Sequence, residues 1–301
     1  MLKQGEGFKA ELILLLVTVL AGFGWIFAKE ALVGLPPLFF MAMRFLIAGF
    51  VLFLVGQKYF KSLDWALIKQ ACFVGVIMGI TMMFWITGLD QGSNLGVGAF
   101  ITSLGVVMVP LVARFMFGQR PPMNIWLALP IAILGLALLA LNNGLDFEFA
   151  QFYFLGAAIG SAFQLNFLSR FSMRMHPLVL TAVQLIVAGV FLLILSLLTE
   201  SLPNSISISV AGWFLASTLI ATSLRFLLQT YGMSLTQVSH AAVIMNLEPV
   251  WAALLAVVWF KEVMAVGQVA GCVLIFIAML VSRWPQIKGM FYSKSHELTP
   301  K

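Results

Sequence analysis

Two stretches of the chain, which begin 140 residues apart, are similar enough to be copies of one sequence. Residues Pro37–Leu54 read PLFFMAMRFLIAGFVLFL and residues Pro177–Ile194 read PLVLTAVQLIVAGVFLLI, with six of the 18 aligned residues identical. Each stretch is close to the length that crosses a bilayer, about 20 apolar residues of helix. We therefore predict that the chain consists of two related halves, each with one of these stretches as a transmembrane helix.

The composition of the whole chain is typical of a protein dissolved in lipid. Hydrophobic residues make up 62% of the 301 residues and charged residues 9%, whereas soluble domains are about half apolar and a quarter charged. No loop is long enough to hold a soluble domain. Apolar runs of bilayer length predict an all-α membrane protein with ten transmembrane helices, at 10–31, 37–56, 66–88, 94–117, 123–142, 151–171, 177–198, 209–231, 238–260 and 264–283.

The distribution of charge predicts how the chain is oriented. If the N-terminus is cytoplasmic, 13 of the 17 Lys and Arg residues fall on the cytoplasmic side. Lys29 and Lys261 fall on the outer side, and Arg44 and Arg225 lie within predicted spans. The positive-inside rule therefore predicts a multi-pass protein of the inner (plasma) membrane with both termini in the cytoplasm. The net charge of +6 then reflects membrane orientation, and we expect no nucleic-acid partner.

The two halves are predicted to lie upside down relative to each other. The first half, residues 10–142, crosses the membrane five times, so the second half, residues 151–283, must enter from the opposite side. A polar cytoplasmic tail follows at residues 284–301. Inverted repeats of this kind are common in carriers that expose a central site to each side of the membrane in turn.

Two prolines predict where helices bend. Pro110 and Pro249 lie 139 residues apart, each inside the fourth helix of its half. Proline removes a backbone hydrogen bond, and unpaired backbone at membrane depth is tolerated against protein or a water-filled cavity. We therefore predict that both prolines act as hinges beside a cavity.

Three segments contain landmark residues of a known family of membrane proteins. Gly22–Gly49 has a Trp, a Lys, a Pro pair and an Arg, and Gly92–Pro122 and Gln237–Val263 contain the two helix-breaking prolines. These segments resemble the EamA domain of the drug/metabolite transporter superfamily. The resemblance implies ten helices and secondary transport of metabolites, often export. The chain departs from the family pattern at Gly118–Arg120, where a Glu is common, and at Gln184, which stands where the first half has an Arg.

Charged residues inside the spans are candidates for function because a charge within a bilayer costs free energy. Glu248 lies near the middle of the ninth span and has two competing interpretations. It could pair with Arg225 or another donor and stabilise the bundle, or it could bind a cationic substrate group or carry a coupling proton. Arg44 and Arg225 could each receive a substrate carboxylate, or they could bond to free backbone carbonyls beside the bent helices.

Polar and aromatic side chains within the spans could line a chamber around this carboxylate. Amides can instead join helices by hydrogen bonds, and the sequence leaves both roles open. A Trp ring could also hold a cationic group through its quadrupole. The predicted substrate-binding residues are Trp25, Arg44, Asn94, Thr102, Gln164, Asn166, Gln184, Arg225, Gln229, Asn246, Glu248 and Trp251.

These observations predict a secondary active transporter that exports a small polar metabolite, such as an amino acid or amine, by alternating access around a midplane cavity. The sequence has no GxxxxGK[ST] nucleotide-binding loop, so a gradient must supply the energy. A carrier of phosphorylated sugars or nucleotides, a channel and an intramembrane enzyme are the alternatives. An enzyme would need paired acids, a metal cluster or an activated nucleophile, so we expect no enzyme, metal or cofactor. Proton coupling, and a monomer or a homodimer, are left open.

Overall fold

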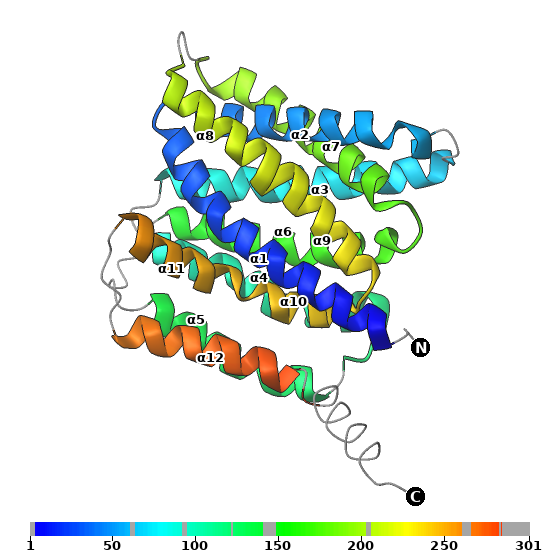
Figure 1. The fold of residues 1–301 in the computed structure, drawn as a ribbon, viewed down its shortest axis with the longest axis vertical. Helices are drawn as coiled ribbons and strands as arrows, with labels where there is room; N and C mark the ends of the chain where they lie inside the picture. The colour runs from blue at the N-terminus through cyan, green and yellow to red at the C-terminus, as the bar shows by residue number, and fades with distance from the viewer. Residues whose placement is uncertain are drawn as a thin grey trace, which may run out of the picture.

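The computed structural model is a bundle of helices (Figure 1) and describes residues 4–60, 64–91, 95–121, 123–140, 149–202, 206–260, 266–282 and 284. No residue in these ranges belongs to a β-strand. The helices are α1 (Gln4–Leu32), α2 (Pro37–Phe60), α3 (Trp65–Gln91), α4 (Leu95–Phe117), α5 (Met123–Ala140), α6 (Ala150–Ser172), α7 (Pro177–Thr199), α8 (Ile208–Thr218), the π-helix η2 (Leu219–Leu224), α9 (Arg225–Ser234), α10 (Val238–Met245), α11 (Glu248–Phe260) and α12 (Val266–Ser282).

Apolar helical segments occupy all ten of the predicted spans. Within the described residues, seven segments are long and apolar enough to cross a bilayer. The three shorter ones are Ile101–Phe117 in α4, Met123–Gly135 in α5 and Val269–Ala278 in α12. The prediction of an all-α, multi-pass membrane protein is therefore confirmed.

The two stretches that first indicated a repeat pack directly against each other. A Cβ atom added to Gly49 on α2 would lie 2.9 Å from the backbone nitrogen of Ile186 on α7, and one added to Gly189 on α7 would lie 2.9 Å from that of Leu46 on α2. Residue numbers thus run in opposite directions along the contact, so α2 and α7 are antiparallel. Because each residue of one contact is the 140-residue counterpart of a residue in the other, a two-fold axis relates the two helices and inverts one half relative to the other.

Around this axis, the first helix of each half packs against helices of the other half. The first helix, α1, packs against α8, α9, α10 and α11, whereas α6 packs against α3 and α4. Helices α5 and α12 form a pair at one edge of the bundle (Figure 1). We call α1 with α8–α11 the α1 group and α3, α4 and α6 the α6 group. Each group contains the first helix of one half and the third and fourth spans of the other.

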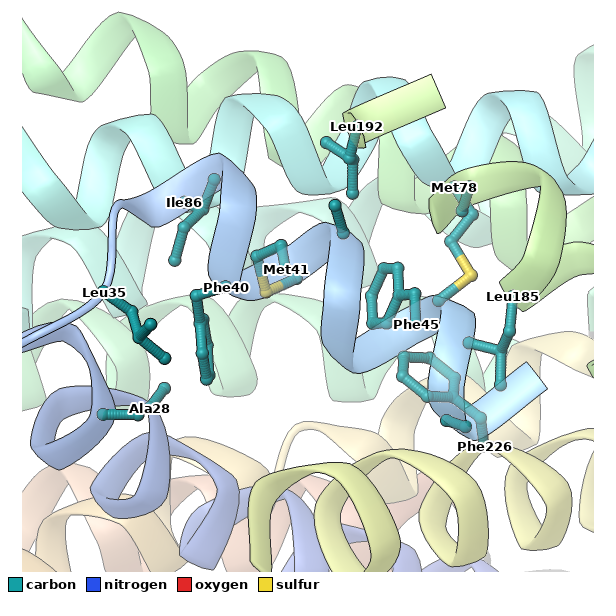
Figure 2. Close-up of a cluster of buried hydrophobic side chains, with 14 of the residues drawn as sticks. Ala28, Leu35, Phe40, Met41, Phe45, Met78, Ile86, Leu185, Leu192 and Phe226 are labelled. Atoms are coloured by element: carbon teal, nitrogen blue, oxygen red, sulfur yellow. The ribbon is translucent and has the colours of Figure 1, made fainter. Parts of the chain in front are cut away.

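Large apolar side chains fix the part of α2 that carries Arg44. Figure 2 shows Phe40 and Phe45 of α2 in a buried cluster with side chains of α3, α7 and α9, including Met78 and Phe226. The rings of Phe45 and Phe226 meet edge to face, with centroids 5.9 Å apart. Lipid tails are as apolar as these side chains, so close packing rather than removal from water stabilises the cluster.

Two of the spans are interrupted. The eighth span changes from α8 to the π-helix η2 and then to α9. The ninth span is broken at Asn246 and Leu247, so Pro249 is the second residue of a new helix, α11, rather than an interior residue. Pro110, by contrast, lies inside the continuous helix α4. The two prolines that match in the sequence therefore have different structural surroundings.

A carboxylate from the second half holds the start of α2. Glu200, at the end of α7, accepts hydrogen bonds from the backbone N–H groups of Leu38 (2.7 Å) and Phe39 (2.8 Å) and from the hydroxyl of Ser196 (2.8 Å). The first N–H groups of a helix have no partner within the helix, and negative charge is favourable beside them. This contact therefore ties the two halves together at one end of the α2–α7 pair.

His176 caps the start of α7 at the other end of that pair. Its Nδ1 accepts a hydrogen bond from the backbone N–H of Leu178 at 3.3 Å, and its ring stacks on that of Tyr59 with centroids 3.6 Å apart. Partial burial and, secondarily, the positive charge of Lys58 lower the pKa of His176 below its usual value of 6.5. A neutral imidazole can accept at Nδ1, so these surroundings favour the form that caps the helix.

Candidate functional site

A cavity of about 140 Å³ lies between the α1 group and the α6 group, with α2 completing its wall. Both halves of the chain contribute to its lining. The lining residues are Ala21, Gly24, Trp25, Met41, Arg44, Met82, Trp85, Thr102, Ser103, Ser161, Gln164, Leu165, Ala221, Arg225, Phe226, Gln229, Met245, Glu248 and Pro249.

An ion pair lies in this lining. Arg225 Nη2 is 3.1 Å from Glu248 Oε2, and the indole N–H of Trp25 donates to Glu248 Oε1 at 3.0 Å. Both oxygens of the carboxylate therefore have a donor. The side chains of Arg225 and Glu248 are 15% and 24% exposed, so a solute in the cavity can reach the pair. The pairing of Glu248 with Arg225, one of the two interpretations that the sequence left open, is present in the structure.

Arg44 brings a second positive charge to the cavity. The residue is 5% exposed, and its Nε–H donates a hydrogen bond to Thr222 Oγ1. Its Cζ atom lies 5.6 Å from the ring centroids of both Phe40 and Phe45. No described carboxylate lies within ion-pair distance of Arg44. Since the ion pair described above is neutral, the described part of the lining has one positive charge in excess.

Both interruptions of the helices lie against the cavity. The π-helix and the start of α9 contribute to its wall, and Glu248 and Pro249 enter the wall just after the break that precedes α11. Within η2, the hydroxyl of Thr222 donates to the carbonyl of Ser217, five residues earlier, at 2.8 Å. π-Helical turns are frequent at functional sites, and irregular backbone at membrane depth is tolerated where it lines a cavity.

Several buried polar atoms of the lining have no hydrogen-bond partner within the described part of the chain. They are Thr102 Oγ1, Gln164 Nε2, Arg225 Nε and Gln229 Oε1. Buried polar groups nearly always bond to protein or to water, and leaving one unpaired costs about 1–3 kcal/mol. These four lining residues therefore have buried donors or acceptors that the described helices leave without a partner.

The structure brings seven of the predicted substrate-binding residues together at the cavity. They are Trp25, Arg44, Thr102, Gln164, Arg225, Gln229 and Glu248, and the predicted hinge Pro249 lies among them. The other predicted hinge, Pro110, is not in the cavity wall. Asn94 lies outside the described residues.

Two predicted binding residues join helices instead of lining the cavity. The amide nitrogen of Asn166 donates to the carbonyl of Val109 at 3.0 Å and so links α6 to α4. The indole N–H of Trp251 donates to Thr18 Oγ1 at 3.0 Å and links α11 to α1. Polar side chains often hold transmembrane helices together in this way.

Gln184 and Asn246 are also buried away from the cavity wall. Gln184 lies on α7, and Asn246 lies at the break in the ninth span. Both polar atoms of each amide have no hydrogen-bond partner among the described residues. The structure therefore gives no support for a contact between these two side chains and a solute in the cavity.

The repeat offset identifies a lining residue that the prediction missed. Three lining residues of α1 and three of α6 form pairs that are separated by 140 residues. The pairs are Ala21 with Ser161, Gly24 with Gln164, and Trp25 with Leu165. Projecting the small residues beside Trp25 onto the second half would thus have found Ser161.

Two tryptophan rings meet between the two groups of helices. Trp25 of α1 and Trp85 of α3 are in edge contact, with ring centroids 4.9 Å apart and ring planes at 74°. Trp85 was not predicted to bind substrate. Trp85 falls within a predicted span, but no helix break marks that span in the sequence, so its position does not indicate the cavity.

Comparisons with known proteins match both halves of the chain. A family model described as the EamA-like transporter family matches residues 8–141 and 148–284. An uncharacterized transporter of Archaeoglobus fulgidus is 28% identical over 285 residues, which cover 92% of this chain and 87% of that protein. The uncharacterized transporter YoaV of Bacillus subtilis is 23% identical over 277 residues, which cover 89% and 94% of the two chains. A protein of known crystal structure shares the fold, with a TM-score of 0.77 at 19% identity over 91% of this chain and 96% of that chain.

Proposed function

Because the chain belongs to the EamA-like transporter family and is a multi-pass membrane transporter, we propose that it carries a small polar metabolite through the central cavity by secondary active transport. The observation that carries the proposal is the position of the cavity. It lies between two groups of helices, and each group contains helices from both halves. Motion of one group against the other would open the cavity on one side of the membrane and close it on the other.

Alternating access follows from the inverted relation of the halves. When two inverted halves exchange conformations, a cavity that faces one side of the membrane comes to face the other side. The close contact between α2 and α7 lies on the two-fold axis, so it serves as the fixed point of this exchange. The contact between Trp25 and Trp85 connects the α1 group to the α6 group, so it must open in one of the two states.

We further propose that the protein is an exporter of the inner membrane with both termini in the cytoplasm. The concentration of Lys and Arg in alternate connections supports this orientation. The ion pair supplies a means of coupling to protons, because protonation of Glu248 would remove its attraction for Arg225. Transport coupled in this way would depend on the pH difference across the membrane, and that dependence would be lost in Glu248→Gln.

Exchange in proteoliposomes tests the proposed function. Purified protein is reconstituted and loaded in turn with labelled monocarboxylates, amino acids, amines and sugar phosphates. A carrier predicts saturable exchange of at least one class, accelerated by the same solute on the opposite side of the membrane. Current that does not saturate in planar bilayers would instead indicate a channel. A lack of exchange for every class would contradict the proposal.

A further inference from the structure

We infer that the solute is a small organic monoanion whose carboxylate binds Arg44, an inference that rests on the proposed function. The charge balance of the cavity favours an anion. Its described lining contains two guanidinium groups and one carboxylate. The carboxylate of Glu248 already accepts from Trp25 and Arg225, one bond to each oxygen. A cationic substrate group would therefore have to share the single carboxylate with Arg225, whereas an anionic group would find Arg44 without a described carboxylate partner.

Arg44 itself has no described countercharge. A buried charge in a bilayer is costly unless it has a partner of opposite sign, and breaking a buried pair leaves such a charge uncompensated. Arg44 is 5% exposed and donates its Nε–H to Thr222, whereas its two terminal nitrogens have no described hydrogen-bond partner. The terminal nitrogens of a guanidinium can bind both oxygens of a carboxylate together. A bound carboxylate would therefore supply the missing countercharge.

Neighbouring side chains hold the guanidinium of Arg44 in one orientation. Thr222 accepts from Arg44 and donates in turn to the carbonyl of Ser217, so the π-helix η2 fixes one edge of the group. The Cζ atom of Arg44 also lies 5.6 Å from the ring centroid of Phe40 and 5.6 Å from that of Phe45. Thr222 is thus a positioning residue, and the guanidinium is oriented before any solute arrives.

The net charge of the cavity and its other lining residues indicate what the solute carries besides a carboxylate. One excess positive charge matches a monoanion, whereas a phosphate monoester carries about −1.5 to −2 charges at neutral pH. Trp25 and Trp85 add an aromatic wall. A small monocarboxylate therefore fits this charge better than an amine, a zwitterionic amino acid or a phosphate ester.

Thermal unfolding of the purified full chain, followed by tryptophan fluorescence, tests this inference with four probes at equal ionic strength. The probes are lactate, alanine, ethylammonium and inorganic phosphate, which separate a monocarboxylate from a zwitterion, a cation and a multivalent anion. We expect a saturable rise in melting temperature with lactate that exceeds the rise with each other probe. An equal or larger rise with alanine, ethylammonium or phosphate, or no rise with lactate, would overturn the inference.

Variants then locate the binding site. Arg44→Gln should abolish the lactate effect, and Thr222→Val should raise the half-saturating lactate concentration several-fold without removing the charge. Arg174→Gln, at an exposed arginine outside the cavity, should respond as the parent protein does. A lactate effect that persists in Arg44→Gln would overturn the assignment. If that variant does not fold, Arg44→Lys keeps the charge but loses the planar pair of donors, and an unchanged lactate response in it would also overturn the assignment.

Reconstituted protein separates this inference from the proposed function. Saturable exchange of alanine or ethylammonium that lactate does not inhibit would overturn the monoanion and leave the carrier in place. Lactate binding that depends on Arg44, together with a lack of exchange for every solute class, would support the anion site and overturn the carrier.

Discussion

Three charged side chains share one membrane cavity, and their partners determine which of them a solute can use. Arg225 and Glu248 neutralise each other, whereas Arg44 has a hydroxyl and two aromatic rings but no described carboxylate. Charges at membrane depth are expensive and usually face a cavity or a partner. Arg225 and Glu248 face the cavity and are partners of each other even without a solute. Arg44 would gain a partner of opposite charge when a solute carboxylate binds.

The ion pair can be tested by a double-mutant cycle. Glu248→Gln should leave Arg225 without its countercharge and lower the stability of the protein by about 1–3 kcal/mol, the cost of a lost charged hydrogen bond. Arg225→Gln should have a similar effect. The double variant Glu248→Gln/Arg225→Gln should be more stable than the sum of the two losses predicts, because it leaves no unpaired charge. Thermal unfolding in detergent measures all four proteins, and additive losses would show that the pair does not interact.

The charged residues of the site could be predicted from the sequence, whereas the amides could not be separated into lining and packing residues. Arg44, Arg225 and Glu248 stand out because ionisable groups are rare inside spans. Gln164 and Asn166 are two residues apart on one helix, which places them about 200° apart around its axis. They therefore could not both face the cavity. Residue type alone does not tell which face of α6 is turned inward, but the 140-residue offset places Gln164 opposite Gly24, beside the predicted lining residue Trp25. The structure shows that the face of Gln164 lines the cavity.

At the scale of helices, the length of the apolar runs predicts the spans. Interruptions of the spans can be predicted only where a proline marks them. The break before α11 is next to Pro249. The π-helix η2, in contrast, contains no Gly or Pro. Its wide turn is accompanied by hydrogen bonds from Thr222 and Ser223 to the carbonyls five residues earlier. Hydroxyl residues are common throughout such spans, so nothing specific in the sequence marks this segment.

The contact between α2 and α7 predicts equal sensitivity at two glycines. Gly49→Ala and Gly189→Ala would each place a Cβ atom 2.9 Å from the backbone of the facing helix, so the helices must separate. Overpacking of this kind costs about 1–3 kcal/mol, and the two-fold axis predicts similar losses for the two variants. The control is Gly212→Ala, where an added Cβ meets no atom within 4 Å. Thermal unfolding measures the three variants, and a loss at Gly212 as large as at Gly49 would contradict the contact.

The cap of α7 predicts a dependence of stability on pH. The pKa of His176 is lowered in the folded protein, so the unfolded chain binds its proton more readily. The contribution of the cap should therefore be fully present above the usual pKa of 6.5 and should be lost as the pH falls through the lowered folded value. His176→Asn supplies an acceptor that does not titrate. We expect the melting temperature of the parent protein to fall more steeply between about pH 7 and pH 5 than that of His176→Asn, and equal slopes would exclude this role.

At the scale of the whole molecule, the two-fold axis relates helices that the chain separates by 140 residues, yet it does not relate the charges. Arg44 corresponds to Gln184 in the second half, and the ion pair lies between α9 and α11 of the second half alone. The scaffold therefore has the symmetry that the proposed exchange of conformations between the halves requires. The cavity within it is asymmetric, so it can hold one solute in one orientation.

Chemical access to the cavity from each side of the membrane tests alternating access. Ser161→Cys places a thiol in the cavity wall of a protein whose Cys72 and Cys272 are replaced by Ser, and Ala188→Cys places one in the buried contact of α7 as a control. A membrane-impermeant maleimide is applied to inside-out and right-side-out vesicles, before and after Trp25→Cys is cross-linked to Trp85→Cys. We expect the thiol introduced by Ser161→Cys to react from both sides and cross-linking to abolish the reaction from one side, while the control stays unreactive. A lack of reaction from either side, or reaction from both sides after cross-linking, would contradict alternating access through this cavity.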